Sequence, residues 1–163
     1  MQPEELGRLL DRHAAALQLF ARQWCAHPDD VVQEAFVRLV QQSGAPNDPV
    51  AWLYRVVRNG AISAARSAGR RHRHESQAVR DHWFAPRDDD LLDARLAAES
   101  LELLPLEQRE PIVAHLWGDL TFEQIADIAG VSITTAYRRY QAGLKTLRER
   151  LEAECPPKNS FKT

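Results

Sequence analysis

Apolar side chains recur at helical spacing over most of the first 70 residues, and breaker residues divide them into three segments. The first segment covers 4–24 and is amphipathic. The second starts at Pro28 and ends before Gly44, because a glycine is typical of a helix end. The third starts at Asp48, which can cap a helix with proline at its first position, and is expected to end at Gly69. The pattern predicts a bundle of three helices.

The apolar stripes of these helices assign one set of side chains to a core and leave the others on the remaining faces. The expected core residues are Leu6, Leu9, Leu10, Ala14, Leu17, Phe20, Ala21, Trp24, Val31, Val32, Ala35, Phe36, Leu39, Val40, Trp52, Leu53, Val56, Val57 and Ile62. On the third helix Tyr54 is expected outside the core, on faces that also carry cationic and amide side chains.

Helical segments also follow in the second half of the chain. Residues 71–89 have no sustained apolar period and are interpreted as a linker, and a helix resumes near Asp90 with leucines at helical spacing. Pro105 breaks that helix. The next helix contains Pro111, which cannot donate to a carbonyl oxygen four residues earlier, so this helix either starts late or kinks. Gly118 closes it, and residues 155–163 are expected to form a frayed, disordered tail.

The stretch 121–150 combines the signals of a helix-turn-helix. Thr121 and Gln124 have the spacing of a capping box, in which each side chain accepts a hydrogen bond from the other residue's backbone amide. Gly130 can adopt the positive φ of a short turn, and Ser132 opens the second helix. The residues of that helix at the buried spacing are Ile133, Ala136, Tyr140 and Leu144.

The outward face of this second helix carries polar and cationic residue types that bind DNA bases. Its members are Thr134, Thr135, Tyr137, Arg138 and Gln141. Arginine binds guanine edges or phosphate, threonine contacts thymine methyl groups and glutamine pairs with adenine, as a major-groove recognition helix requires. The segment from Val131 to Arg150 has five cationic residues and one acidic residue, a net +4 that favours DNA over an ordinary solvated helical hairpin.

Charge is unevenly distributed along the chain, although the formal net charge is only −2. Between Ala51 and Arg80 there are seven arginines and one acid, Glu75, whereas 86–110 is strongly acidic. Two basic stretches separated by an acidic one indicate two nucleic-acid surfaces. The small net charge excludes a basic tail that coats nucleic acid indiscriminately.

The third predicted helix mixes aromatic, amide and cationic side chains. This mixture suits single-stranded or melted DNA, because planar groups hold unpaired bases and cations bind the backbone. The candidate residues are Trp52, Arg55, Arg58, Asn59, Arg66, Arg70 and Arg71. The alternative is that Trp52 belongs wholly to the core and that the arginines are merely solvated.

Other classes of site have little support in the sequence. Cys25 and Cys155 form no CxxC pair and the six histidines lack ligand spacing, so no metal, cofactor or disulfide is expected. Asp29, Asp30 and Glu34 could form the carboxylate cluster of a metal-dependent nuclease, but acids at a helix start favour the helix dipole, and a protein-docking surface is preferred. With no signal peptide or long apolar span, we expect a cytoplasmic protein without membrane insertion. The nuclease would need a second acidic cluster related to the first, and the sequence shows none, so the protein is not expected to be an enzyme.

Three motifs, in this order, resemble the extracytoplasmic-function group of bacterial RNA polymerase sigma factors in the sigma-70 superfamily. DDVVQEAFVRL resembles the polymerase-clamp-binding helix, AWLYRVVRN resembles the promoter-melting helix, and the stretch from Leu104 to Leu151 resembles the second domain. The resemblance covers nearly the whole chain. It implies an all-α protein with a sigma region 2-like helical bundle at 1–70 and a sigma region 4-like helix-turn-helix domain at 90–154, joined by a flexible linker at 71–89.

The resemblance also implies partners and residue roles. The partners are core RNA polymerase and promoter DNA, and an anti-sigma factor is left open. The polymerase-binding residues would be Asp30, Gln33, Glu34 and Arg38. The minus-ten element would meet Trp52 and Asn59, with Arg58, Arg66, Arg70 and Arg71 on nearby backbone, and the minus-thirty-five element would meet Thr135, Tyr137, Arg138 and Gln141. Gly60 departs from the family pattern, which usually has a larger helix former there; a glycine within a helix costs about 1 kcal/mol relative to alanine.

Two other functions remain as alternatives. A free-standing helix-turn-helix regulator would dimerise on palindromic half-sites, but the sequence offers no clear heptad seam and this function leaves AWLYRVVRN unexplained. A polymerase-binding adaptor would sequester polymerase or a sigma factor without reading DNA.

Overall fold

The computed structural model describes residues 2–72 and 99–154, and both ranges are helical apart from short turns. The helices are α1 (Pro3–Ala21), α2 (Pro28–Gln41), α3 (Pro49–His72), α5 (Leu106–Leu116), α6 (Phe122–Ala129) and α7 (Ile133–Glu154). Neither described range contains a strand, which confirms the predicted all-α fold.

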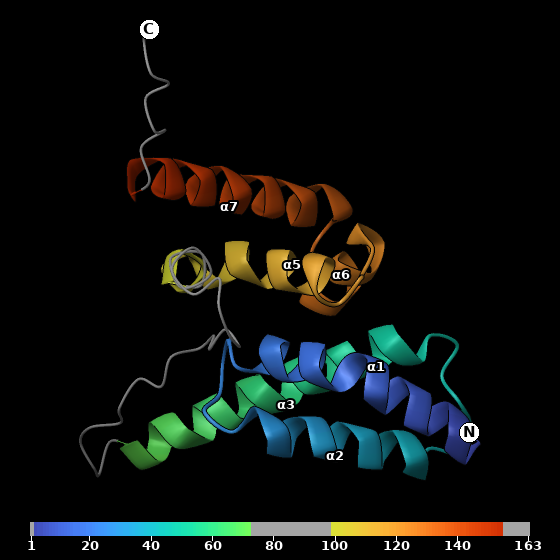
Figure 1. Cartoon of the computed structure of the whole chain (residues 1–163). Coiled ribbons are helices and arrows are strands. Elements are labelled where there is room, and N and C mark those ends of the chain that lie inside the picture. Colours follow the sequence, from blue (N-terminus) through green and yellow to red (C-terminus); the bar gives the residue numbers. More distant parts are fainter. Residues whose placement is uncertain (1, 73–98, 155–163) are drawn as a thin grey trace, which may run out of the picture.

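Helices α1, α2 and α3 pack against one another and form the first domain (Figure 1). Its core draws on all three helices through Leu17, Phe20, Ala21, Val32, Ala35, Phe36, Leu39, Leu53, Tyr54, Val57 and Ala61. The ring of Phe20 contacts those of Trp24 and Tyr54 edge to face, with both centroid separations at 5.0 Å. Each large apolar side chain buried in this way stabilises the domain by about 1.5–3 kcal/mol.

Helix α3 crosses α2 closely at Gly60. A Cβ atom at this position would lie 3.0 Å from Cγ1 of Val31, so the two helices approach more tightly than a side chain on residue 60 would comfortably allow. The departure from the family pattern noted above therefore has a packing reason, since a side chain at residue 60 would require Val31 to shift by a few tenths of an ångström.

Helices α5, α6 and α7 form the second domain around Ile112, Val113, Ala114, Leu120, Ile125, Ala126, Ile128 and Ala136. Helix α5 begins at Leu106 with Pro105 as its N-cap, and Pro111 lies inside it. The sequence left open whether this helix starts late, near Pro111, or kinks there. The helix begins five residues before Pro111, so the late start is wrong. At Gly143 a Cβ atom would come within 2.6 Å of Cδ1 of Ile112, so α7 lies directly on α5.

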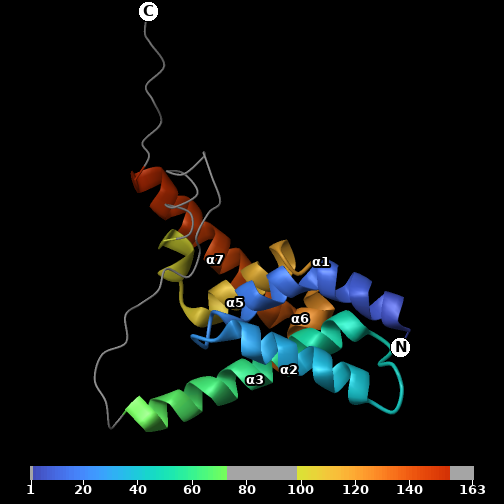
Figure 2. The same cartoon turned by 60° about the horizontal axis from the view of Figure 1, so that its bottom comes forward.

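The two domains are docked on each other. In Figure 1, α5 and α6 lie between α7 and the helices of the first domain, and α3 contacts α6 while α1 contacts α5. Figure 2 shows that the C-terminal turns of α3 extend beyond the other helices. The first turns of α3 are thus covered by the second domain and the last turns are not.

Several predicted helix boundaries differ from the structure. Helix α1 ends at Ala21 and not at Trp24, and α3 continues past Gly69 to His72. The reason at Gly69 is that this glycine keeps a negative φ and continues the helix, whereas Gly44 and Gly130 are the described glycines with positive φ. The predicted linker beyond residue 72, the helix start near Asp90 and the tail lie outside the described residues.

Four burial predictions are also wrong. Tyr54 is 0 % exposed because it lies under the second domain, a contact that the periodicity of α3 cannot reveal. In contrast, Leu10, Val40 and Ile133 were expected in the core but are 45 %, 57 % and 50 % exposed. Leu10 and Val40 line a groove described below, and Ile133 is the first residue of α7, where no helix packs over it.

Candidate nucleic-acid interface

The helix-turn-helix is held by two local sets of hydrogen bonds, both predicted from the sequence. The Thr121 hydroxyl accepts from the Gln124 amide at 3.3 Å, and the Gln124 side chain accepts from the Thr121 amide at 2.7 Å. Gly130 ends α6 with φ of 70°, and the Ser132 hydroxyl accepts from the Thr135 amide at 3.1 Å. These contacts satisfy amides that helix starts leave unpaired, and they fix the angle at which α7 leaves the turn.

Aromatic side chains join α5, α6 and α7 beneath the turn. The His115 ring stacks on Phe122 at a centroid distance of 4.7 Å, and its Nδ1 lies 2.8 Å from the carbonyl oxygen of Leu120. Tyr140 meets both rings edge to face, at 5.3 and 5.1 Å. The sequence interpretation gave His115 no role, because its ring partners lie on two other helices, α6 and α7. This cluster positions the helix whose outer face is the candidate DNA surface.

The first two turns of α7 present most of the predicted groove-binding side chains to solvent. Thr134, Tyr137, Arg138 and Gln141 are exposed. The Gln141 side-chain amide donates to the Tyr137 hydroxyl at 3.0 Å, which restrains both side chains. Thr135 is half-buried and its hydroxyl lies 2.8 Å from that of Ser132, so it belongs to the helix start as well as to this face.

Among the described side chains, the predicted minus-ten residues on α3 divide into a group without an ion pair to the second domain and a group whose members form one. Asn59, Arg66 and Arg70 are exposed, while Trp52 is half-buried and packs against the core. The backbone of Arg71 is helical, but its side chain lies outside the described part of the chain. The intermediate burial of Trp52 agrees with neither a wholly buried ring nor a free one.

The paired group consists of Arg55, which is exposed, and Arg58, which is half-buried. Arg55 forms an ion pair with Asp127 of α6. Nε of Arg58 lies 2.5 Å from Oε1 of Glu110 on α5, and its guanidinium lies 5.8 Å from the centre of the Trp24 ring. Both pairs join the two domains, and no local sequence signal predicts them, because the partners are 72 and 52 residues apart.

The exposed side of α2 carries the predicted polymerase-binding side chains. Asp30, Gln33, Glu34 and Arg38 are all exposed. Nε of Arg38 donates to the Glu34 carboxylate at 2.8 Å, one helical turn apart. Such an exposed pair contributes little stability, about 0.3–0.5 kcal/mol. Breaking this ion pair to bind a partner protein would therefore cost little free energy.

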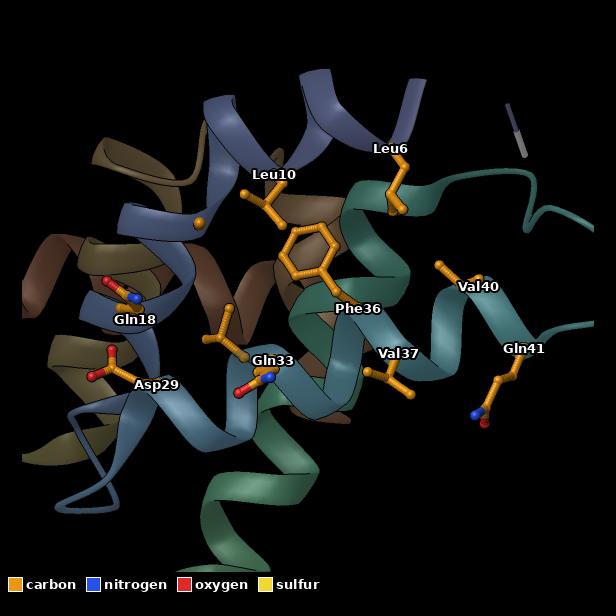
Figure 3. A pocket seen from close by; sticks show the side chains of 11 residues that line it. Leu6, Leu10, Gln18, Asp29, Gln33, Phe36, Val37, Val40 and Gln41 are labelled. Carbon is orange, nitrogen blue, oxygen red and sulfur yellow. The ribbon is translucent and has the colours of Figure 1, made fainter. Parts of the chain in front are cut away.

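An apolar groove of about 570 Å³ runs beside these residues, between α1 and α2 (Figure 3). Phe36 points from α2 toward Leu10 of α1, and Val37 and Val40 continue the groove wall toward the end of α2. The full lining is Leu6, Leu10, Ala14, Gln18, Asp29, Val32, Gln33, Phe36, Val37, Val40 and Gln41. The sequence interpretation missed the groove; the signal was an apolar stripe on α2 too wide for a single packed face.

The described residues also bear on the metal-site and thiol chemistry considered in the sequence. They contain no group of three or more His, Cys, Asp or Glu side chains that could hold a metal ion. Burial raises the pKa of the Cys25 thiol, which disfavours the reactive thiolate. Within the same described ranges, no helix combines the length and the apolar character that crossing a membrane requires.

Comparison with known protein families gives two matches in chain order. Residues 6–71 match the family described as sigma-70 region 2, and residues 94–147 match sigma-70 region 4. The first match covers α1 to α3 and the second covers α5, α6 and most of α7.

Relatives with known names match both regions at once. The chain is 31 % identical over 154 residues to the ECF RNA polymerase sigma factor SigL of Mycobacterium tuberculosis, covering 88 % of this chain and 87 % of that one. It is 29 % identical over 155 residues to the RNA polymerase sigma factor CarQ of Myxococcus xanthus, with the same coverage of 88 % and 87 %.

Two solved structures share the fold. The sigma factor RpoE of Bartonella quintana, in complex with the anti-sigma factor NepR, superposes with a TM-score of 0.73 at 23 % identity over 93 % of this chain and 99 % of that one. CnrH, in complex with the cytosolic domain of CnrY, superposes with a TM-score of 0.63 at 25 % identity over 94 % and 91 %.

Proposed function

Because the chain belongs to the extracytoplasmic-function RNA polymerase sigma factors of the sigma-70 family, we propose that it uses its two domains to bind two promoter elements while α2 holds core RNA polymerase. The function of the family is promoter recognition in transcription initiation. What we add is the assignment of that function to particular side chains of this chain.

We assign the minus-thirty-five element to the exposed face of α7. The observation that carries this assignment is the row of exposed Thr134, Tyr137, Arg138 and Gln141 directly after a capped, glycine-closed turn. A helix placed in this way enters the major groove with the residues of its first turns on the base edges. Thr135 joins this surface through its half-exposed side chain.

We assign the minus-ten element to α3. Asn59 can donate to and accept from an unpaired base, and Trp52 lies seven residues earlier, within about 20° of the same helix face. Arg66 and Arg70 follow on the turns of α3 that extend beyond the other helices, where they can reach the DNA backbone, and Arg71 is the next residue (Figure 2). Arg55 and Arg58 complete the cationic set once they leave their partners in the second domain.

We assign polymerase binding to the exposed side of α2. Asp30, Gln33, Glu34 and Arg38 provide charged and amide groups at the rim of an apolar groove, and an interface needs such a combination of apolar centre and polar rim. An anti-sigma factor is a further proposed partner, since the similar RpoE structure is a complex with one. The protein would act in the cytoplasm without catalysing a reaction itself.

Run-off transcription with core polymerase and a library of promoter fragments tests this function. Polymerase with the protein should yield transcripts from a subset of promoters that polymerase alone ignores. If the protein binds promoter fragments as a dimer without polymerase, its function would be that of a free-standing regulator and not that of a sigma factor. If the protein binds polymerase in a pull-down yet yields no transcript from any promoter, its function would be that of a polymerase-binding adaptor.

A further inference from the structure

Two exposed side chains on the first turns of α7 are joined by a hydrogen bond across one helical turn. The Gln141 side-chain amide donates to the Tyr137 hydroxyl at 3.0 Å. Both residues are exposed, and 49 % of the Tyr137 surface is accessible to solvent. An exposed glutamine ordinarily loses its rotamer freedom only when it binds a partner, and this ordering lowers affinity. Here the neighbouring tyrosine already supplies part of that ordering.

The ring of Tyr137 is itself held by the helix before it. It meets the ring of Phe122 edge to face, at a centroid distance of 5.1 Å and an interplanar angle of 87°. Phe122 belongs to α6, is half-buried and stacks on His115 of α5 at 4.7 Å. A tyrosine has only two side-chain torsions, so a ring held in this way also places its hydroxyl. The hydroxyl is therefore a fixed point on a solvated helix face.

The hydrogen bond to Tyr137 decides which polar groups of Gln141 remain for DNA. A glutamine amide has two N–H donors and one carbonyl oxygen that accepts. Donation of one N–H to Tyr137 leaves one donor and the acceptor. Adenine presents the complementary pair in the major groove, the N7 acceptor beside the N6 amino donor, whereas guanine presents two acceptors, N7 and O6. An amide held in this way matches adenine and sets its oxygen against an acceptor of guanine.

The other side chains on this face carry a different chemistry. Arg138 lies three residues before Gln141 and Thr134 seven, so all three project from one side of α7. Arg138 has only donors and favours guanine or phosphate, and Thr134 presents a single hydroxyl. Among these three residues, Gln141 alone can form a bidentate contact to adenine.

We propose that Tyr137 is a positioning residue for base recognition: by holding the Gln141 amide, it makes α7 select an A·T over a G·C base pair at one position of the upstream duplex element. The proposal rests on the assignment of α7 to the minus-thirty-five element. Because the Tyr137 ring packs on Phe122 while its hydroxyl orients Gln141, the residue connects the packing of the helix-turn-helix to the base that is read.

The variants separate the hydroxyl of Tyr137 from its ring. Tyr137→Phe removes the hydroxyl and keeps the ring on Phe122. Gln141→Ala removes the amide, and a double variant combines both changes. The matched control is Thr146→Val, which also removes a hydroxyl hydrogen bond from α7, the 3.1 Å contact from Thr146 to the carbonyl oxygen of Ala142. Circular dichroism checks that every variant remains helical.

The first measurement is equilibrium binding of the complex with core polymerase to a promoter that the run-off library selects, with each base pair of the upstream element replaced in turn. The ratio of affinities for A·T and G·C at one position cancels differences in folding and in polymerase binding. Wild type should prefer A·T about five- to hundredfold at the position whose preference is lost in Gln141→Ala. Tyr137→Phe should lower that ratio about two- to tenfold. The double variant should match Gln141→Ala, and Thr146→Val should keep the wild-type ratio.

The second measurement uses the free full-length chain without DNA. Nuclear magnetic resonance spectra resolve the side-chain amide signals of individual glutamines. The signals of Gln141 should shift in Tyr137→Phe, while those of Gln42, which is exposed on the first domain, stay in place. Phenylalanine keeps the aromatic ring, so the shift reports the lost hydroxyl. In Thr146→Val the Gln141 signals should stay at their wild-type positions.

Unchanged Gln141 signals in Tyr137→Phe would overturn the hydrogen bond on which the proposal depends. A wild-type preference for G·C at the Gln141 position, or an unchanged ratio in Tyr137→Phe, would overturn the orienting role. A further loss of preference from Tyr137→Phe when residue 141 is already alanine would overturn the action through Gln141, because the hydroxyl would then read the base itself. Failure of the proposed function is a separate result: the wild-type complex would bind no promoter, even if the signals of the free chain shift as expected.

Discussion

The hydroxyl oxygen of Tyr54 fills the space beside Gly118, where a Cβ atom would come within 2.7 Å of it. Tyr54 belongs to α3 in the first domain and Gly118 follows α5 in the second, so this contact joins the two domains. The Tyr54 side chain is fully buried, and its hydroxyl has no hydrogen-bond partner among the described residues. Burial, with a smaller effect from Asp119, raises the pKa of this hydroxyl.

Tyr54→Phe should leave stability unchanged or raise it by up to about 1 kcal/mol, because a buried hydroxyl without a partner costs about 1–3 kcal/mol of desolvation. Thermal unfolding followed by circular dichroism measures the difference. The control is Tyr54→Ala, which should cost about 3–5 kcal/mol through the cavity left by the ring. A loss above about 1 kcal/mol in the phenylalanine variant would show that the hydroxyl has a stabilising partner.

His13 should make the protein less stable at mildly acidic pH. Burial lowers its pKa from the usual 6.5, Arg12 lowers it further, and Asp119 opposes them. The unfolded chain then binds more protons than the folded one between the two pKa values, so stability is complete above about pH 7 and falls as the pH drops below 6.5. Urea unfolding between pH 7.5 and 5 should show a steeper loss for wild type than for His13→Gln. His27→Gln at an exposed position is the control, and parallel curves for wild type and His13→Gln would remove His13 from the pH dependence.

Arg138→Ala should weaken recognition of the upstream duplex element and leave binding to core polymerase intact. The lost base or phosphate contact should cost about 1–3 kcal/mol, and selectivity at one base position should relax if the contact is to a base. Promoter binding by the polymerase complex on a panel of single-base variants measures both effects. Arg148→Ala, an exposed arginine further along α7, is the matched control. Equal binding of all promoter variants by wild type and Arg138→Ala would show that this face does not read the groove.

Asn59→Ala should impair open-complex formation without unfolding the protein, because alanine is a better helix former and only the exposed amide is lost. Permanganate footprinting of thymines in the downstream element reports melting on closed duplex. On a template with a pre-melted bubble, a pure melting defect should largely disappear, whereas lost base recognition should persist. Wild-type reactivity on closed duplex would exclude Asn59 from the site, and Ser63→Ala, one turn further along the helix, serves as the control.

Glu34→Lys should reduce polymerase affinity about tenfold or more by reversing a charge on the proposed docking face. Its effect on stability should be small, since the exposed Glu34–Arg38 pair contributes about 0.3–0.5 kcal/mol. The matched control is Glu149→Lys, an exposed glutamate of α7 with a cationic neighbour one turn away. A pull-down that retains equal polymerase with both variants would exclude Glu34 from the interface.

Local features of the fold could be predicted from the sequence. The Thr121–Gln124 capping box, the positive φ of Gly130 and the Ser132 cap were all predicted, because each depends on residues within four positions of one another. The exposed face of α7 followed for the same reason, since helical periodicity fixes which side chains share a face.

Long-range contacts could not be predicted in this way. Tyr54 was placed outside the core because its burial depends on the second domain, which lies more than 50 residues away in sequence. The pairing of Arg58 with Glu110 has the same origin. Apolar periodicity likewise assigned Leu10 and Val40 to the core without distinguishing a packed interior from the wall of an open groove.

The close crossing of α3 over α2 at Gly60 makes two positions of the sequence interdependent in evolution. A Cβ atom at residue 60 would meet Val31 at 3.0 Å, so this chain combines the smallest side chain at one position with a β-branched one at the other. Relatives with alanine or a larger residue at position 60 should compensate with a smaller side chain at position 31, or with a wider crossing. Position 31 lies within the proposed polymerase-binding helix, so a substitution in the melting helix would constrain which residues the neighbouring helix can accept.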